Sequence, residues 1–147
     1  MHVQTGIFPV HAEDYPRVVE VWEASVRATH DFVSSSDIEI FRPIVRDVLP
    51  KLVLACVRDE AGAVAGFIAV GDVKVEMLFI HPDCRGQGAG RRLMTHAVET
   101  LGATEVDVNE QNEQAVGFYL HLGFETFRRS ELDGMGKPYP ILHMRKC

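Results

Sequence analysis

Residues 85–92 read Arg85-Gly86-Gln87-Gly88-Ala89-Gly90-Arg91-Arg92, with a glycine at every second position between the arginines. Glycine lets the backbone turn tightly and come close to a ligand. We expect this segment to connect a strand ending at Ile80 with a helix that begins near Gly88. The first turn of such a helix presents unpaired N–H groups and the positive end of the helix dipole. The segment is therefore a candidate site for a phosphate or pyrophosphate.

Two familiar phosphate-binding motifs do not fit these residues. A P-loop requires a lysine followed by serine or threonine after its last glycine, and arginines follow Gly90 here. A dinucleotide-binding fingerprint requires a different glycine spacing, after the first strand of a parallel βαβ unit. From these residues alone, an ordinary glycine-rich turn with solvated arginines is the simpler alternative to a phosphate site.

On both sides of this segment, apolar residues alternate between helical and strand spacing. The expected helices cover residues 14–29, 36–49, 88–101 and 112–122, and the expected strands cover 3–8, 52–57, 63–70, 73–80, 104–109, 124–130 and 141–145. Asp14 is the expected N-cap of the first helix, and Ser36 with Glu39 resembles a capping box for the second. Pro43 should kink the second helix or divide it into two short ones. The order predicts an α/β fold with a mixed, mostly antiparallel sheet of about seven strands and about four helices.

The composition indicates one globular domain over residues 1–147 and excludes several classes of protein. Apolar residues make up 46%, charged residues 24%, and the formal net charge is -6. An acidic chain is a poor general nucleic-acid binder and a poor polybasic membrane binder, so neither partner is expected. No apolar run is long enough for a membrane helix, and the N-terminus lacks a secretory signal pattern. Three cysteines, Cys56, Cys84 and Cys147, cannot all pair and show no CxxC spacing, which favours a cytoplasmic location.

The charge is unevenly distributed around the glycine-rich segment. Residues 84–98 contain three arginines and no acid, whereas residues 99–127 contain six acids and no lysine or arginine. This pattern indicates a basic pocket, suited to an anionic ligand, in an otherwise acidic protein.

Two motifs give the chain a family resemblance. The pattern Arg85-x-x-Gly88-x-Gly90 between a strand and a helix resembles the acetyl-CoA motif of the GNAT N-acetyltransferase superfamily. The stretch from Asn112 to Phe124 is similar to a second family signature, Asn-x-x-Ala-x-x-Phe-Tyr-x-x-x-Gly-Phe. Both occur in the family's order and spacing, and further segments, among them residues 28–32 and 136–140, resemble a group of small bacterial N-acetyltransferases.

The resemblance implies acetyl-CoA as co-substrate, with no metal. It implies that the pyrophosphate binds backbone N–H groups of the glycine-rich segment and that the pantetheine arm lies along a strand that splays from its neighbour, 104–109. Asn112 would hold the arm from the other side, although an asparagine there also suits a helix N-cap. The implied cofactor-binding residues are Leu78, Phe79, Ile80, Arg85, Gly86, Gln87, Gly88, Ala89, Gly90, Arg91 and Asn112.

Tyr119 matches the family's general acid, which protonates the leaving thiolate of coenzyme A. A phenol with a pKa near 10 stays protonated at neutral pH and can serve that role. The alternative is an ordinary core aromatic, but we expect the neighbouring Phe118 to take the core position. Cys84 precedes the glycine-rich segment, where a helix N-terminus can lower a thiol pKa. The family favours direct transfer over an acetyl-cysteine route.

The sequence leaves the acceptor side open. Candidates for the base or the acceptor contacts are His30, Phe32, Glu76 and Asn109, and water can serve as the base instead. The loops 29–37 and 131–140 should border the acceptor, and their acids would suit a cation. The histidines show no spacing typical of a zinc site.

The resulting prediction is an N-acetyltransferase that transfers acetyl from acetyl-CoA to a primary amine in a ternary complex. The amine can belong to a protein lysine, a protein N-terminus or a small molecule. A non-catalytic acyl-CoA sensor is the alternative, and it would have no need of Tyr119. The chain can act as a monomer or a homodimer.

Overall fold

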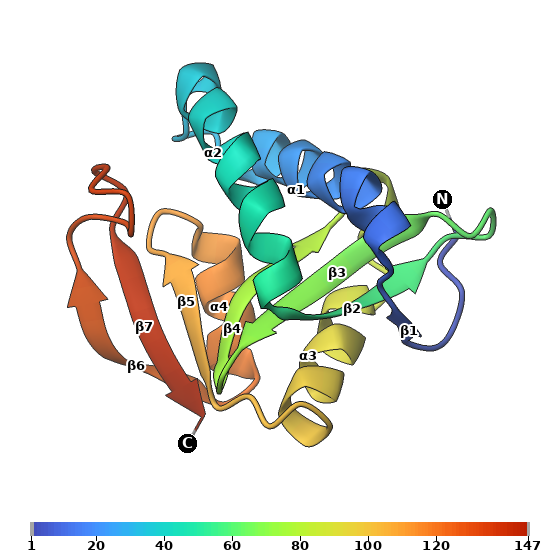
Figure 1. The fold of residues 1–147 in the computed structure, drawn as a ribbon. Helices are drawn as coiled ribbons and strands as arrows, with labels where there is room; N and C mark the ends of the chain where they lie inside the picture. The colour runs from blue at the N-terminus through green and yellow to red at the C-terminus, as the bar shows by residue number, and fades with distance from the viewer. Residues whose placement is uncertain (1, 147) are drawn as a thin grey trace.

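The computed structural model describes residues 2–146. Within this part of the chain, a seven-stranded sheet has the order β1-β2-β3-β4-β5-β7-β6, with helices on both faces (Figure 1). The strands are β1 (Phe8–Pro9), β2 (Val53–Arg58), β3 (Val64–Gly71), β4 (Lys74–Ile80), β5 (Glu105–Asn109), β6 (Phe124–Ser130) and β7 (Ile141–Lys146). β4 and β5 pair in parallel, and the other neighbours pair antiparallel. The predicted α/β class, mixed sheet and element order are confirmed.

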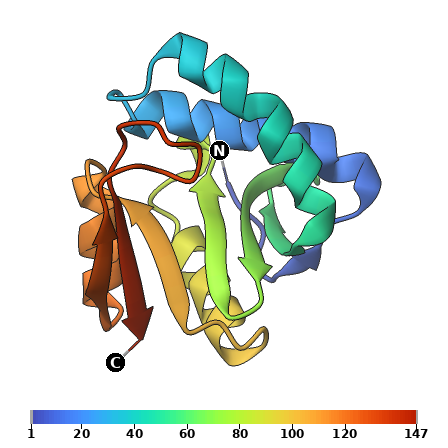
Figure 2. The same ribbon diagram turned by 60° about the vertical axis from the view of Figure 1, so that its left-hand side comes forward.

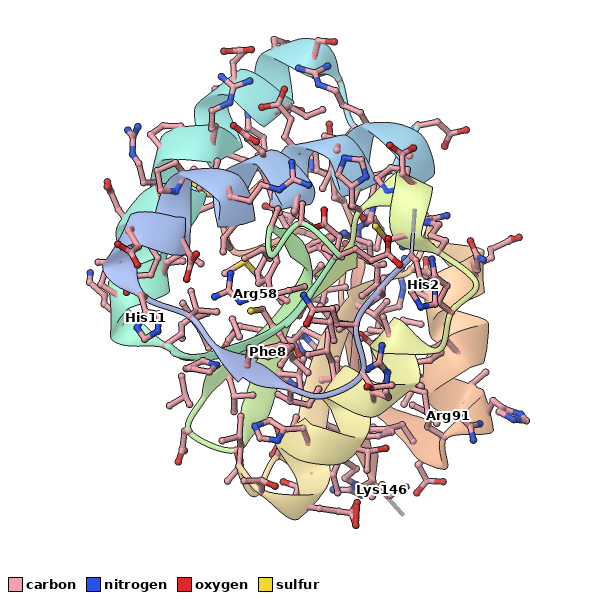
Figure 3. The ribbon with its side chains drawn as sticks, turned by 90° about the vertical axis from the view of Figure 1, so that its right-hand side faces the viewer. His2, Phe8, His11, Arg58, Arg91 and Lys146 are labelled. Atoms are coloured by element: carbon pink, nitrogen blue, oxygen red, sulfur yellow. The ribbon has the colours of Figure 1, made fainter. Side chains whose placement is uncertain are left out.

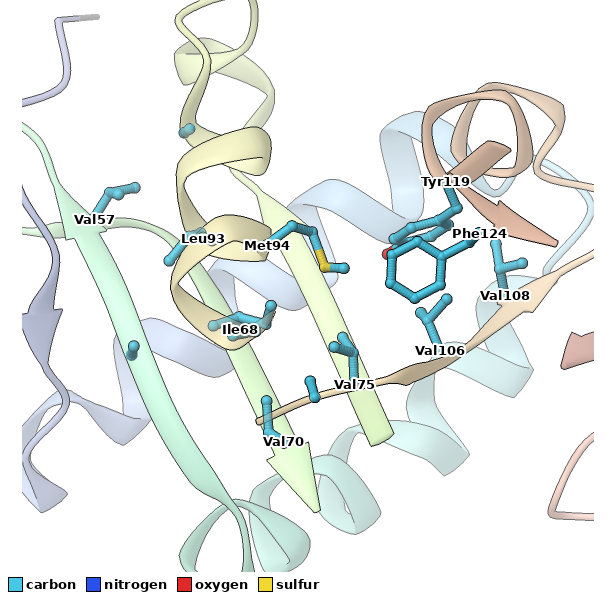
Figure 4. Packing of buried hydrophobic residues seen from close by; sticks show 14 of the residues in the cluster. Val57, Ile68, Val70, Val75, Leu93, Met94, Val106, Val108, Tyr119 and Phe124 are labelled. Atoms are coloured by element: carbon cyan, nitrogen blue, oxygen red, sulfur yellow. The ribbon is translucent and has the colours of Figure 1, made fainter. Parts of the chain in front are cut away.

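The four α-helices divide between the two faces of the sheet. They are α1 (Tyr15–Thr29), α2 (Ser35–Val48), α3 (Ala89–Glu99) and α4 (Glu113–His121). α1 and α2 bury their apolar faces in one core, together with Phe67 and Cys56, whereas α3 and α4 contribute to a second core, together with Ile68 and Met144. Figure 4 shows part of the second core, in which Leu93 and Met94 of α3 pack over the sheet. β3 lies between the two cores, which explains its nearly continuous burial.

The expected first strand, 3–8, is wrong in its extent. Val3 forms an isolated bridge with Asp59, and the regular strand β1 is limited to Phe8 and Pro9. Between them Gly6 has a φ of 105°, which an extended strand cannot accommodate. The Val3 N–H donates to the side chain of Gln87 instead of to a strand.

The second helix differs from its prediction in two ways. It begins at Ser35, and its N-cap is Ser34, whose hydroxyl accepts from the Asp37 N–H at 3.1 Å. Ser36 therefore does not start a capping box. The helix also continues through Pro43 as one element, so two short helices do not form. At the first helix, Asp14 precedes Tyr15 as predicted, but its carboxylate pairs with Arg58 at 3.0 Å, beside Phe8 (Figure 3).

β4 carries an extra residue opposite β3. Ala69 lies opposite Met77 and Val70 opposite Val75, which leaves Glu76 without a partner in β3. This is a β-bulge, and a bulge shifts the alternation of side chains along a strand. The alternation shifts at Glu76, so that Val75 packs in the same core as Leu78 and Ile80.

β4 and β5 separate immediately after this bulge. Their pairing in the described chain consists of Lys74 with Glu105 and Val75 with Val106. Figures 1 and 2 show the two strands diverging from that point toward the end of β4. The backbone of residues 77–80 therefore has no strand partner on the β5 side, as the family resemblance implied.

No helix among the described residues is long and apolar enough to cross a membrane. Cys56 and Cys84 are buried free thiols, and Cys147 lies outside the described residues.

Candidate functional site

A cavity of about 330 Å³ opens where β4 and β5 separate. Four parts of the chain line it: the end of α1, the second half of β4, the glycine-rich segment with the first turn of α3, and α4. Figure 3 shows the α3 and α4 helices side by side on one flank of the molecule. The gap in the sheet therefore opens into a space enclosed by helices from both faces.

The glycine-rich segment forms the polar end of this cavity. Gly86 and Gly88 both have a φ of 77°, a left-handed conformation that favours glycine. Gly88 is the N-cap of α3, and because it has no side chain, none caps the first N–H groups of the helix. The lining residues from this region are Cys84, Arg85, Gly86, Gly88, Ala89, Gly90 and Arg91. Free N–H groups next to two exposed arginines suit a phosphate ligand.

Two polar residues of the segment point their side chains elsewhere. The Gln87 side chain accepts from the Val3 N–H at 2.8 Å, and Gln87 is not among the lining residues. Arg92 donates to the Gln4 carbonyl at 3.2 Å. Both side chains hold the N-terminal segment against the loop, so Arg92 does not add its charge to the cavity as expected.

The second half of β4 forms the wall of the cavity. Leu78 and Ile80 pack on the α3 and α4 side, whereas Phe79 packs on the α1 and α2 side. All three line the cavity. A chain-like ligand with amide groups can hydrogen-bond to such an unpaired strand as an added strand would.

Tyr119 lines the cavity from α4. Its ring is 5% exposed and packs edge-on against Phe118 and Phe124, at centroid distances of 5.2 and 6.1 Å. Figure 4 shows this ring beside Phe124 and above Val106. The expectation that Phe118 takes the core position is wrong: Tyr119 belongs to the buried core and Phe118 is partly exposed.

The Tyr119 hydroxyl has no hydrogen-bond partner among the described residues. Burial raises the pKa of this phenol above its usual value, so it stays protonated at neutral pH. A protonated hydroxyl without a protein partner, in a cavity wall, can donate to a ligand.

His30 is the C-cap of α1 and lines the same cavity. Its side chain is buried, and burial together with the nearby positive charge of Arg85 lowers its pKa to about 4. The Thr29 hydroxyl lies 2.7 Å from Nδ1, and the Asn112 amide nitrogen lies 3.4 Å from Nε2. His30 is therefore a neutral imidazole at neutral pH.

Asn112 has one of the two roles considered from the sequence, that of a helix N-cap. Its Oδ1 accepts from the Ala115 N–H at 3.2 Å, which makes it the N-cap of α4. Its amide nitrogen faces His30 and the cavity. One side chain thus caps a helix and connects α4 with α1.

Three other candidates are not placed in this cavity to act as proposed. Glu76 is exposed, and its carboxylate lies 3.6 Å from the Lys74 ammonium. Asn109, in β5, is paired with Ile141 of β7. Neither residue lines the cavity. Cys84 does line it, but burial raises the pKa of its thiol, opposite to what a nucleophile requires. Within residues 2–146, no group of three histidine, cysteine or acidic residues is placed to hold a metal ion.

Phe32 lies outside the cavity, next to His30, with ring centroids 5.2 Å apart. On its other side, the Tyr139 ring is 6.0 Å away. The Tyr139 hydroxyl donates to Asp37, and Lys137 forms an ion pair with Asp37 at 3.3 Å. The structure thus brings the loops 29–37 and 131–140 together, but Asp37 is already neutralised and offers no free charge to a cation.

Several lining residues were not anticipated from the sequence, namely Ser25, Gln114, Ala115 and Phe118. Ser25 could have been found, because it is a polar residue in the apolar stripe of α1. A buried polar position in such a stripe indicates that something other than core packing lies opposite.

Comparison with known proteins decides the family. Residues 50–146 match the model of the acetyltransferase (GNAT) domain. The chain belongs to the GNAT acetyltransferase family. Acetyl-CoA is the acetyl donor of GNAT enzymes, and this GNAT protein is an acetyltransferase that transfers the acetyl group to an amine.

Its relatives include the peptidyl-lysine N-acetyltransferases YjaB of Escherichia coli and of Salmonella typhimurium. The GNAT chain is 42% and 40% identical to them over 132 residues, which is 90% of this chain and 90% and 91% of theirs. The solution structure of apo YjaB from Escherichia coli matches with a TM-score of 0.87 over 99% of this chain and 97% of that chain. The closer likeness to small bacterial acetyltransferases is confirmed.

A more distant structure confirms the fold. PaiA N-acetyltransferase from Thermoplasma acidophilum, solved with coenzyme A, is 18% identical and matches over 100% of both chains with a TM-score of 0.73. The GNAT fold of this chain is thus shared at low identity.

Proposed function

We propose that this GNAT enzyme acetylates the ε-amino group of lysine side chains in proteins. The observation that carries the proposal is its identity of 40–42% to two peptidyl-lysine N-acetyltransferases over nine-tenths of both chains. The surroundings of the cavity are consistent with a peptide acceptor, because Phe32 and Tyr139 provide aromatic surface beside His30. Aromatic faces attract both the aliphatic stem and the ammonium of lysine.

We assign the donor to the cavity in two parts. The N–H groups at Gly88, Ala89 and Gly90, with Arg85 and Arg91, bind the phosphates of acetyl-CoA. Leu78, Phe79 and Ile80 hold the pantetheine arm along the unpaired edge of β4, and Asn112 faces it from α4. A backbone N–H of this edge polarises the thioester carbonyl as an oxyanion donor does.

The transfer is then direct, within a ternary complex. The amine nitrogen forms a bond to the thioester carbon, the C–S bond breaks, and the Tyr119 hydroxyl donates its proton to the departing sulfur. The raised pKa of Tyr119 keeps that proton available at neutral pH. A covalent acetyl-cysteine route is disfavoured, because the Cys84 thiol has a raised pKa.

The decisive experiment compares acceptor peptides that differ in one amine. The protein is mixed with acetyl-CoA and a peptide that has a blocked N-terminus and one lysine, and product is identified by mass spectrometry. The matched peptide carries norleucine in place of lysine. We expect acetylation of the lysine peptide alone. Acetylation of free N-termini or small amines, with none on lysine, would refute the lysine assignment but leave the acetyltransferase assignment in place.

We also propose that residues 1–147 form a single GNAT domain in the cytoplasm. The continuous sheet from β1 to β6 supports one domain, and the free thiols Cys56 and Cys84 fit a reducing compartment. Limited proteolysis should yield one resistant fragment.

A further inference from the structure

The hydrogen bonds around His30 determine its tautomer. The Thr29 hydroxyl donates its one proton to the Ser25 carbonyl at 2.7 Å. The same oxygen lies 2.7 Å from His30 Nδ1, so it must accept there, and Nδ1 must carry the ring proton. Nε2 of this neutral ring is therefore an unprotonated nitrogen with a free lone pair.

Asn112 supports the same assignment from the other side. Its Oδ1 accepts from the Ala115 N–H, which turns the amide NH₂ group toward His30. An NH₂ group can only donate, so Nε2 accepts from it at 3.4 Å. A contact of that length is weak and leaves the lone pair available to a bound ligand.

His30 is distinctive among the cavity-lining side chains. The lining contains no aspartate or glutamate, its arginines are always charged, and its buried thiol is protonated. Among the lining residues that the structure describes, the His30 imidazole is thus the one side chain with an unprotonated nitrogen that can receive a proton from a reacting group. Arg85 and Asp31 are the charged groups that shift its pKa, Arg85 downward and Asp31 upward.

His30 and Tyr119 lie on opposite sides of β4. Successive side chains of a strand point to opposite faces. Phe79 packs against the His30 ring at 6.2 Å on one face, while Leu78 and Ile80 pack with the Tyr119 core on the other. A thioester held along the open edge of β4 would therefore have a proton acceptor on one side and a proton donor on the other.

We infer that His30 Nε2 accepts the proton that the attacking amine loses. As the neutral amine forms its bond to the carbonyl carbon, its nitrogen becomes strongly acidic and passes a proton to Nε2. The C–S electron pair goes to sulfur, which takes the Tyr119 proton. Solvent then removes the proton from His30 and restores the one on Tyr119. The inference rests on acetyl transfer to an amine, whichever amine it is, and so is separable from the choice of lysine.

The first test is kinetic and uses chemical rescue. His30→Ala should lower kcat about 100-fold with a lysine peptide or any other amine that the wild type acetylates. It should leave the Kd of acetyl-CoA within a few-fold of wild type. Added imidazoles should restore turnover, and more basic imidazoles should restore it faster. His11→Ala, in the segment that precedes α1 (Figure 3), is the control and should behave as wild type with no response to imidazole.

Two results would overturn the inference. Undiminished kcat in His30→Ala would mean that water serves as the base. The second is that imidazole does not restore the kcat of His30→Ala while the variant His30→Gln keeps the wild-type kcat. That result would show a packing role, because glutamine can bond to Asn112 yet cannot take up a proton.

The second test does not depend on turnover or on a folded variant. In the ¹⁵N spectrum of the wild-type histidine rings at neutral pH, His30 should show a protonated Nδ1 and an unprotonated Nε2. A protonated Nε2 would refute the inference outright. If only lysine peptides fail as acceptors while small amines react, the lysine proposal falls and the role of His30 stands.

Discussion

Tyr119 combines a buried ring with a hydroxyl that has no partner among the described residues. Burial without a partner normally costs free energy. Because the hydroxyl opens onto the cavity, that cost is avoided once a ligand or water accepts from it. The ring atoms of Tyr119 therefore pack in the core, while its hydroxyl is left to interact with a ligand.

Tyr119→Phe separates these two contributions. The ring packing against Phe118 and Phe124 is kept, so the melting temperature should stay near that of wild type. Losing the proton donor should lower kcat by about 100-fold, because the thiolate must leave unprotonated. Steady-state kinetics and acetyl-CoA binding are the measurements, and an unchanged kcat would remove Tyr119 from the mechanism.

His30 makes the stability of the protein depend on pH. Its folded pKa of about 4 lies below the usual 6.5, so the unfolded chain binds the proton first as the pH falls. The stabilisation is therefore complete above pH 6.5 and is lost between about pH 6.5 and 4. His30→Gln should remove this slope, which amounts to about 2–3 kcal/mol across that window. Urea unfolding at several pH values, with His11→Ala as control, measures it.

At the residue scale, the sequence predicted well which residues line the cavity. It predicted less well which contacts each of them makes there. Tyr119, Asn112 and His30 all line it, because each is next to a family motif or a helix end. Glu76 could not be predicted, since the bulge that displaces it depends on pairing with β3. That Tyr119 rather than Phe118 is buried likewise could not be predicted, because it depends on how α4 is rotated against the sheet.

The loop before α3 is the element on which the proposed donor site rests. Gly88 has left-handed φ, and a side chain there would meet no atom within 4 Å. Asparagine and aspartate are similar in size and both tolerate this conformation better than most residues. The difference between Gly88→Asn and Gly88→Asp is thus mainly one of charge at the proposed phosphate site.

We predict that Gly88→Asp weakens acetyl-CoA binding about tenfold or more relative to Gly88→Asn, by charge repulsion. Both variants should have similar melting temperatures. Calorimetric titration at low and moderate salt measures the effect, which should shrink as salt increases. Equal affinities of the two variants would place the phosphates elsewhere.

The pairing of β3 with β4 leaves no space at Gly66. A Cβ there would lie 2.6 Å from Ile80 Cδ1 and 3.2 Å from the Phe79 carbonyl oxygen. Gly66→Ala must therefore displace Ile80 and move the β4 backbone slightly, at a cost of about 1–3 kcal/mol. We expect a lower melting temperature and a higher KM for acetyl-CoA. Gly134→Ala is the control, because a Cβ there would meet no atom within 4 Å and Gly134 does not have a left-handed φ.

At the element scale, periodicity predicted every helix and all strands after the first to within one or two residues. These elements bury one or both faces, and burial imposes the pattern that is read from sequence. The first strand failed because its partner, β2, is distant in the chain. The start of α2 failed because Ser34, Ser35 and Ser36 all suit an N-cap, and the local sequence does not decide among them.

Across the whole molecule, two segments 100 residues apart meet at Asp37. This carboxylate accepts from the Tyr139 hydroxyl and pairs with Lys137, and both partners hold its pKa below its usual value. Figure 2 shows the loop between β6 and β7 reaching toward the start of α2. The contact joins the helices α1 and α2 to the far edge of the sheet.

Asp37→Ala should release that loop. Amide hydrogen exchange should quicken in residues 131–140, and the KM for the acceptor should rise a few-fold, while acetyl-CoA binding stays the same. Asp47→Ala removes an exposed acid from the same helix and should change neither quantity. Unaltered exchange in the loop would show that the aromatic contacts of Tyr139 suffice to hold it.

The open edge of β4 also bears on how long the protein survives in a cell. Residues 77–80 lack a strand partner on the β5 side, because the pairing of β4 with β5 ends at Val75 and Val106. At the proposed donor site along that edge, bound acetyl-CoA would stabilise the folded state by mass action, in proportion to the logarithm of its concentration above Kd. Degradation by proteases, which act on opened chains, then slows when acetyl-CoA is plentiful. The proposed donor site would thus couple the lifetime of the enzyme to the supply of its own substrate.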